Sequence, residues 1–167
     1  MFNFFLKTMY IKQLFLSAII AIVLLSSPNN SSAQFVNGHS YLGPHLTFAS
    51  ETGGSFILGA NFEAPITQPG TAGPGMFAIA VRGDLWFATG GPYFFAAALA
   101  NYHLKLDDSK IDPLFGLGVS FVGPGSQFFV AFNAGGRYFL NSGLAFRALL
   151  GSEWSVFFFT FGVDWTL

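Results

Sequence analysis

Hydrophobic and polar residues alternate along most of the chain from residue 39 onward. In the final stretch, "VFFFTFGVDWTL", Phe157, Phe161 and Trp165 share one phase, whereas Thr160 and Asp164 share the other. A two-residue period is that of a β-strand whose two faces lie in different surroundings. The stretch therefore predicts a strand that presents rings on one side and a carboxylate on the other.

Eight segments alternate in this way, and each is bounded by a cluster of turn-forming residues. The breaks include "TQPGTAGPG", "TGGP", "DDSKID" and "GPGS", which are rich in the Gly, Pro, Asp and Ser that turns favour. Most segments reach the roughly 9–11 residues that a tilted strand needs to cross hydrocarbon, and an even number is typical of bacterial barrels. The predicted strands cover residues 39–49, 55–66, 76–88, 93–106, 113–122, 128–140, 144–152 and 155–167.

The first 33 residues have a different pattern. Lys7 and Lys12 precede an apolar run over residues 14–25, and small residues follow up to Ala33. A charged start, a short apolar run and a small-residue cleavage site are typical of a secretory signal peptide. The run is too short for a transmembrane helix, which needs roughly 20 residues. We therefore predict a signal peptide over residues 1–33.

Composition favours a membrane for the remaining domain, residues 34–167, whether translation starts at Met1 or Met9. Hydrophobic residues make up 52% of the chain and charged ones 9%, whereas soluble proteins are nearer 25% charged. Five Lys and Arg and eight Asp and Glu follow the predicted signal, a net charge of −3, without the basic clusters that nucleic acid requires. There is no cysteine for a disulfide or thiolate site. In lipid, a chain without helical spans satisfies its backbone as a closed barrel.

The charged residues assign the two faces of the strands. A charge that faces lipid at mid-bilayer costs about 2–4 kcal/mol for Arg or Lys, so we predict that the apolar face points outward. The alternative is a lipocalin-like soluble barrel with the apolar face inside, although an eight-stranded interior is barely wide enough for side chains. Six charged residues are predicted in turns, namely Glu51, Asp107, Asp108, Lys110, Asp112 and Glu153. The other seven lie on the less apolar face of predicted strands, namely Glu63, Arg82, Asp84, Lys105, Arg137, Arg147 and Asp164.

The late segments "FFVAFNAGGRYFL" and "NSGLAFRALLG", with the aromatic C-terminal strand, resemble the small eight-stranded outer-membrane β-barrel family of Gram-negative bacteria. The resemblance covers roughly residues 35–167 and implies an antiparallel, up-and-down transmembrane β-barrel. It also implies insertion by the barrel-assembly machinery, outer-membrane lipid as a partner, and a monomer. The family's last residue is usually aromatic, whereas Leu167 ends this chain and Trp165 is the nearest ring. Such a fold implies a location in the outer membrane but no particular activity.

The lumen of the predicted barrel would hold the seven strand charges, four positive and three negative. Since unpaired buried charges are costly, we expect mutual salt bridges that plug the lumen; an ion or proton path is the alternative. Near the extracellular mouth, five inward-phased side chains either pack the barrel or form a small apolar pocket for a lipid tail or another hydrophobic ligand. They are Ile57, Trp86, Phe95, Phe129 and Phe158.

The histidines His39, His45 and His103 are inward-phased, and enzymes exist on such barrels. The lipid A deacylase pattern has a serine two residues after its histidine, but Lys105 occupies that position after His103. His45 and Thr47 have no evident carboxylate partner in the sequence. We therefore predict no catalytic residue, no cofactor and no metal site.

The predicted function is a structural or interaction role in the cell envelope. A hydrophobic-ligand or lipid-binding barrel is the second interpretation, and a lipid A-modifying enzyme or small-solute channel comes behind it. The outward connections are short, so we expect no large adhesive surface, and eight strands exclude a wide general porin.

Overall fold

The computed structural model describes residues 35, 38–50, 55–71, 73–88, 91–107, 110–123, 127–153 and 156–167. The predicted signal peptide, residues 1–33, lies outside these ranges and stays a prediction. Within these ranges, no helix is both long and apolar enough to span a membrane.

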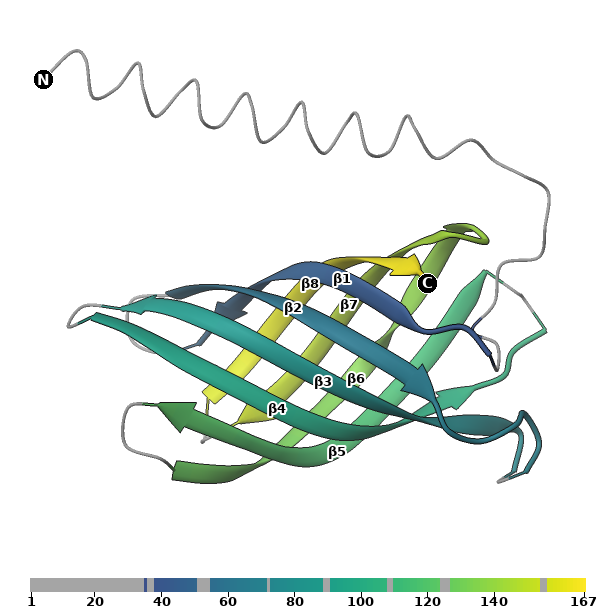
Figure 1. Ribbon diagram of the computed structural model, residues 1–167, viewed down its shortest axis with the longest axis horizontal. Helices are drawn as coiled ribbons and strands as arrows, with labels where there is room; N and C mark the ends of the chain where they lie inside the picture. The colour runs from purple at the N-terminus through teal and green to yellow at the C-terminus, as the bar shows by residue number, and fades with distance from the viewer. Residues whose placement is uncertain are drawn as a thin grey trace, which may run out of the picture.

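Eight antiparallel strands close into one barrel (Figure 1), which confirms the predicted fold class. Each strand pairs with its neighbours in the chain, and β8 pairs with β1 to complete the ring. Every boundary lies within two residues of its prediction, because the period-two pattern and the turn residues mark strand limits directly. The strands are β1 (Tyr41–Ala49), β2 (Ser55–Pro65), β3 (Gly75–Ala88), β4 (Gly91–Leu104), β5 (Ile111–Gly123), β6 (Gln127–Asn141), β7 (Leu144–Glu153) and β8 (Val156–Thr166).

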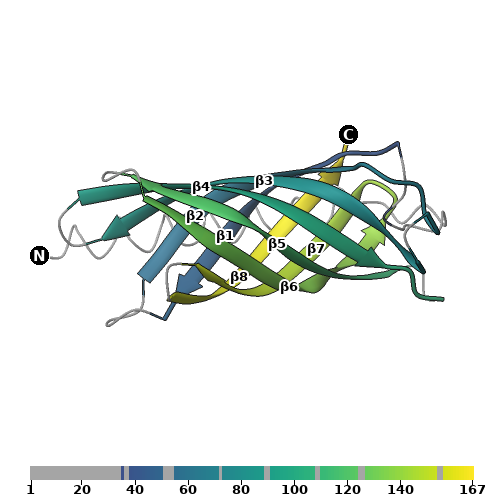
Figure 2. The same ribbon diagram turned by 90° about the horizontal axis from the view of Figure 1, so that it is seen from below.

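The two ends of the barrel can be told apart by where the first and last strands begin and end. In the closing pair, Tyr41 lies opposite Thr166 and Ala49 lies opposite Phe158. The end at which β1 begins and β8 ends is called the terminal end below, and the opposite one the far end. Figure 2 shows the strands from a second side, all inclined to the long axis of the barrel, as closure of a sheet requires.

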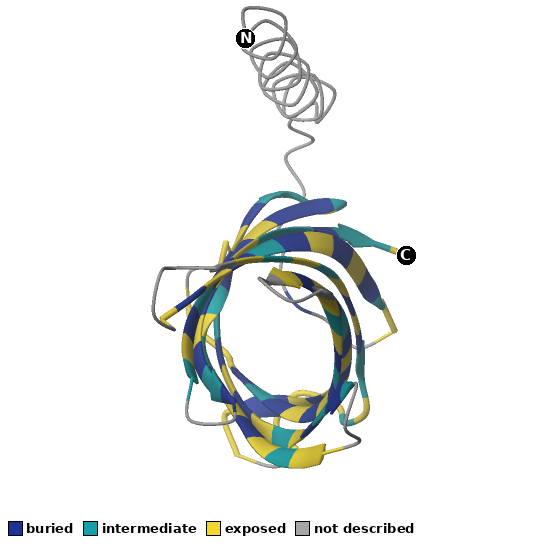
Figure 3. Ribbon diagram, turned by 90° about the vertical axis from the view of Figure 1, so that its left-hand side faces the viewer, coloured by how far each residue is buried: buried dark blue, intermediate teal, exposed yellow. Residues whose placement is uncertain are grey.

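Burial alternates along the strands (Figure 3), and the exposed positions are largely the apolar ones. In β3, Val81 is 51% exposed and its neighbour Arg82 is 7% exposed. Phe77, Leu85 and Phe87 continue the exposed phase. A water-soluble barrel would have the opposite arrangement, so the structure excludes the lipocalin-like alternative.

The interior is arranged in layers. Between two apolar clusters lie buried polar and charged side chains that include Asn61, Asn101, Ser120, Asn133 and Thr160. The cluster at the terminal end consists of Phe35, Tyr41, Met76, Ala78, Phe139 and Ala145. The cluster at the far end consists of Trp86, Phe95 and Val122, with Ile57, Tyr93 and Phe129 packed against it.

Gly59 illustrates how the narrow interior holds long side chains. In the sheet register Gly59 lies between His45 of β1 and Asp84 of β3. A Cβ atom at Gly59 would lie 2.0 Å from Asp84 Oδ1 and 2.5 Å from His45 Nε2. The missing side chain therefore leaves the space in which these two residues meet.

Candidate functional site

Arg137 of β6 is the centre of one group of charges in the lumen. Its side chain is almost fully buried, and it contacts carboxylates from three other strands. Nε donates to Asp164 Oδ2 at 2.5 Å, Nη1 lies 3.4 Å from Asp112 Oδ2, and Nη2 contacts Glu63 Oε2. One guanidinium therefore joins β2, β5, β6 and β8 across the lumen.

His103 and Arg147 complete this group. His103 Nε2 lies 2.9 Å from Glu63 Oε1, and Nδ1 lies 2.9 Å from Asp112 Oδ1. An imidazole ring can donate to both carboxylates only as the imidazolium cation. Arg147 Nη1 lies 2.9 Å from Asp164 Oδ1. We call Glu63, His103, Asp112, Arg137, Arg147 and Asp164 the Arg137 cluster.

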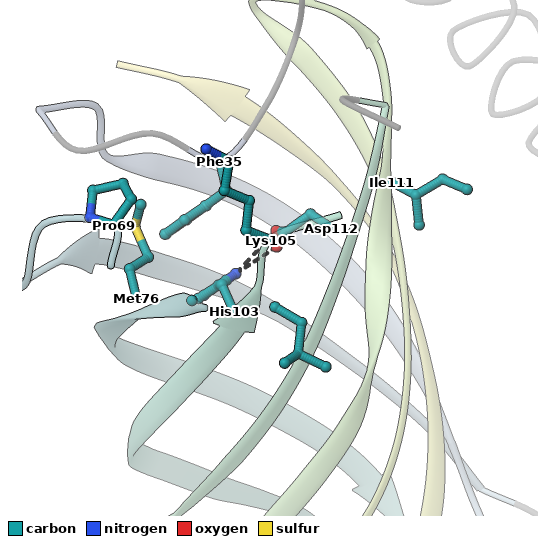
Figure 4. A pocket seen from close by; sticks show the side chains of 9 residues that line it. Phe35, Pro69, Met76, His103, Lys105, Ile111 and Asp112 are labelled. Carbon is teal, nitrogen blue, oxygen red and sulfur yellow. Dashed lines mark hydrogen bonds and ion pairs between the residues drawn. The ribbon is translucent and has the colours of Figure 1, made fainter. Parts of the chain in front are cut away.

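Phe35 covers the Arg137 cluster at the terminal end. Its ring stacks on the imidazole of His103 with 3.7 Å between centroids and 1° between planes. The guanidinium carbon of Arg137 lies 5.3 Å from the centre of the same ring. Beside Phe35 lies a cavity of about 60 Å³, lined by Met76, His103 and Asp112 among others (Figure 4). Phe35 thus packs an apolar ring against cationic groups at the mouth of the lumen.

A second group of charges lies toward the far end. Arg82 Nε donates to Asp84 Oδ2 at 2.6 Å, and Nη2 contacts Glu153 Oε1. His45 Nε2 lies 2.5 Å from Asp84 Oδ1. We call His45, Arg82, Asp84 and Glu153 the Arg82 cluster.

The structure brings six of the seven predicted lumen charges into these two clusters and leaves out Lys105. Because β4 ends at Leu104, Lys105 follows the strand, is exposed and makes no ion pair within the described residues. The prediction that it belongs to the network is therefore wrong. The six that remain are Glu63, Arg82, Asp84, Arg137, Arg147 and Asp164.

Asp112 and Glu153, which we predicted in turns, are buried members of the clusters. β5 begins at Ile111 and β7 ends at Glu153, so both carboxylates take inward strand positions. The two-residue alternation could have predicted both positions. Asp112 has the same phase as the inward-facing Leu114, and Glu153 has the same phase as Arg147. With these corrections the clusters hold three arginines, five carboxylates and two histidines, in place of four positive and three negative charges.

The predicted apolar pocket at the far end is present as a small cavity of about 40 Å³. Four of the five predicted residues, Ile57, Trp86, Phe95 and Phe158, line it. Phe129 instead packs against the neighbouring apolar cluster. A water molecule takes up roughly 30 Å³ in the liquid, so the cavity holds one or two small groups rather than an acyl chain.

The histidines occupy different positions. His39 precedes β1 and is exposed, so its predicted inward position is wrong. His45 does have a carboxylate partner, Asp84, which is contrary to the sequence prediction. A nucleophile would have to lie within hydrogen-bond reach of this histidine. The nearby hydroxyl of Thr47 instead pairs with that of Thr160 at 2.7 Å.

No group of three or more histidine, aspartate or glutamate side chains in the described ranges could hold a metal ion. The contacts that the structure shows in the two clusters are ion pairs and hydrogen bonds across the lumen.

An apolar exterior around a charged and nearly filled lumen defines the class: this chain has the fold of the small eight-stranded outer-membrane β-barrels. A de novo designed transmembrane β-barrel superposes with a TM-score of 0.62 and 14% identity, over 80% of this chain and 99% of the other. The attachment invasion locus protein Ail of Yersinia pestis gives 0.54 and 9% identity, over 79% and 100%. Its backbone structure in a phospholipid nanodisc gives 0.51 and 8% identity, over 77% and 99%.

At such low identities these similarities establish the fold alone. No protein-family model matches the sequence, and a comparison with curated proteins finds no match.

Proposed function

We propose that the protein is an integral outer-membrane barrel whose lumen is closed by ion pairs, with a structural or interaction role in the cell envelope. The observation that carries this proposal is Arg137, which is 2% exposed and is shared by three carboxylates across the lumen. The apolar exterior supports a position in lipid, where hydrocarbon solvates the rings. Both termini would be periplasmic, so that the far end faces outward. The proposed partners are outer-membrane lipid and the assembly machinery, and the proposed state is a monomer.

The layered interior argues against a channel. A solvated ion entering from the terminal end would meet Phe35 and the apolar cluster around it, and then the Arg137 cluster. To pass, it would have to separate ion pairs that have already lost their water, which costs several kcal/mol for each uncompensated charge. We therefore propose that the ion pairs in the lumen hold the strands together and that the lumen does not conduct ions.

Two further functions receive less support. A lipid-binding barrel needs space for a chain, whereas the far-end cavity measures about 40 Å³. A hydrolase needs an activated nucleophile, and no hydroxyl in the described residues hydrogen-bonds to His45. We accordingly propose a non-enzymatic protein.

Planar-bilayer recording of the purified protein tests the closed lumen. We expect no discrete conductance steps from the wild type, because the ion pairs and Phe35 block the path. The triple variant Phe35→Ala/Glu63→Ala/Arg137→Ala removes the covering ring and the centre of the Arg137 cluster, and we expect conductance from it if it inserts. Lys105→Ala, outside the network, is the matched control and should remain silent. Regular single-channel steps from the wild type would contradict the proposal.

The location is tested separately by fractionation of cells that express the full chain. We expect the protein in the outer-membrane fraction, released by detergent but not by high salt or alkali. Recovery as a detergent-free monomer would contradict a position in lipid.

A further inference from the structure

Of the two histidines in the clusters, only His103 contacts a carboxylate through each ring nitrogen. Nδ1 lies 2.9 Å from Asp112 Oδ1, and Nε2 lies 2.9 Å from Glu63 Oε1. His45 contacts Asp84 through Nε2, and its Nδ1 has no hydrogen-bond partner in the described part of the chain. A neutral imidazole has one N–H group and can donate once. One proton therefore suffices at His45, whereas His103 needs two protons to donate to both neighbours.

The proton between His103 and Glu63 belongs to the ring, because both oxygens of Glu63 accept other hydrogen bonds. Asn101 Nδ2 donates to Oε1 at 2.6 Å, and Arg137 Nη2 donates to Oε2. Donors to a carboxylate favour its charged form. Asp112 also faces Arg137, with 3.4 Å between Oδ2 and Nη1. Both neighbours of His103 are thus placed as hydrogen-bond acceptors.

The charges of the Arg137 cluster balance when His103 is protonated. Its three carboxylates, from β2, β5 and β8, face the guanidinium groups of Arg137 and Arg147. An imidazolium at His103 supplies the third positive charge, and a buried charge without a partner is costly. On β3, the neutral Met76 lies opposite His103 in the register. Lys105 of the same chain segment is exposed, so water screens its charge.

Phe35 and the cavity beside it also suit a protonated ring. Phe35 lies parallel to the imidazole of His103 with 3.7 Å between centroids, and aromatic faces attract cations. The cavity of about 60 Å³ is lined by His103 and Asp112, whose side chains point toward one another in Figure 4. A water molecule takes up roughly 30 Å³ in the liquid. Water in this cavity would let the proton exchange at the terminal end, without passage along the lumen.

We propose that His103 is a proton-binding site that stays charged at a pH where an exposed histidine is neutral, and that its proton stabilises the terminal end of the barrel. The imidazolium joins β4 to β2 through Glu63 and to β5 through Asp112, and it gives Phe35 a cation on which to stack. Once alkaline surroundings remove the proton, one of the two carboxylates loses its donor and the barrel loses stability. This inference does not depend on whether the lumen conducts.

Nitrogen NMR of the full-length protein in detergent, labelled with nitrogen-15 histidine, reports the protons on each ring. The chain has three histidines, His39, His45 and His103, and substitution of each by glutamine assigns its signals. An ordinary histidine loses its second proton at about pH 6.5. At about pH 8 we expect protons on both ring nitrogens of His103, and on one ring nitrogen of His45 and of the exposed His39. A neutral His103 at this pH would overturn the proposal.

The variant Asp112→Asn tests the partner that requires the second proton. An amide can donate its N–H to a neutral ring nitrogen, which a carboxylate cannot do. We expect His103 in this variant to bind its second proton at least roughly tenfold more weakly, because one of its two ionic partners is gone. Asp107→Asn removes an exposed carboxylate at the same end of the barrel and should leave proton binding unchanged. Equal proton affinity of the wild type and folded Asp112→Asn would overturn the proposal.

The effect on the barrel is measured by denaturant unfolding in detergent micelles at several pH values. A proton that the folded chain holds and the unfolded chain releases makes stability fall as pH rises. Between about pH 7 and 8 we expect the unfolding equilibrium constant of the wild type to rise roughly tenfold. His103→Gln has no such proton and should give a flat profile, whereas His45→Gln should keep the wild-type slope.

A flat profile of the wild type would overturn the proposal, and so would the wild-type slope in folded His103→Gln. Gel mobility with and without heating checks that each variant is folded. If His103→Gln does not fold, the protonation of the wild-type ring at about pH 8, measured by nitrogen NMR, still decides the question.

Discussion

At the scale of single residues, Arg137 and Lys105 show how much position decides the role of a charge. Arg137 contacts three carboxylates in the lumen, whereas Lys105 lies just past the end of a strand, exposed and outside the two clusters. We expect Arg137→Ala to lower the free energy of unfolding by about 3–5 kcal/mol, because the remaining carboxylates stay buried without their partner. Lys105→Ala should change it little. Denaturant unfolding in detergent micelles measures both, and equal effects of the two substitutions would contradict the assigned roles.

A pair of glycines allows a second test. Gly59→Ala places a methyl group against Asp84 and His45, and we expect it to cost about 1–3 kcal/mol of stability, as overpacking does. Gly83 has no atom within 4 Å of an added Cβ. Gly83→Ala is therefore the matched control and should be nearly neutral. Thermal unfolding of the two variants compares them directly, and similar melting temperatures would show that the lumen has room to adjust at Gly59.

Which residues form the two clusters could be predicted in part. Alternation gave the inward phase of Arg82, Arg137 and Asp164, because phase is a local property of a strand. It failed at strand ends, where Asp112 and Glu153 looked like turn residues and Lys105 looked like a continuation of β4. There the local sequence is compatible with both states, and hydrogen bonding to the neighbouring strand decides between them.

At the scale of elements, the strands are predictable from the two-residue alternation and from the turn residues between them, but the side-chain contacts between strands are not. His45 of β1 reaches Asp84 of β3 because Gly59 of the intervening strand has no side chain. The alternation predicts that all three residues face inward. Whether they meet depends on the register of β1 against β2 and on that of β2 against β3, which the alternation does not give. Phe35 is a similar case, since a single ring before the first strand carries no periodic signal.

Depth in the membrane should control the tolerance of each strand to charge. Leu117 lies in the middle of β5 and is 61% exposed, and Phe128 lies near the far end of β6 and is 73% exposed. We expect Leu117→Arg to cost about 2–4 kcal/mol and Phe128→Arg about 0–1 kcal/mol. Reversible unfolding from lipid vesicles measures both values. Equal costs would contradict the proposed position of the apolar band in lipid.

At the scale of the whole molecule, the charges of the two clusters are enclosed in the lumen, and the exterior strand surface is largely apolar. Salt screens exposed charges strongly but buried pairs much less. We therefore expect the melting temperature in detergent to change little between about 0.1 M and 1 M sodium chloride. Calorimetry at the two concentrations provides the measurement. A large fall in melting temperature would mean that water and ions reach the clusters, contrary to the packed interior described above.

The seam between β1 and β8 has a consequence for biogenesis. β1 pairs with β2 on one side and with β8 on the other. The backbone hydrogen bonds of β1 (Tyr41–Ala49) therefore remain incomplete until β8 (Val156–Thr166) has been synthesised and has joined the barrel. A chain cut short before β8 would expose two unpaired edges to acyl chains, where unsatisfied amides are costly. All eight strands therefore have to be present before the ring of backbone hydrogen bonds is complete. Premature termination should therefore yield no smaller stable product, and such fragments would be substrates for envelope proteases.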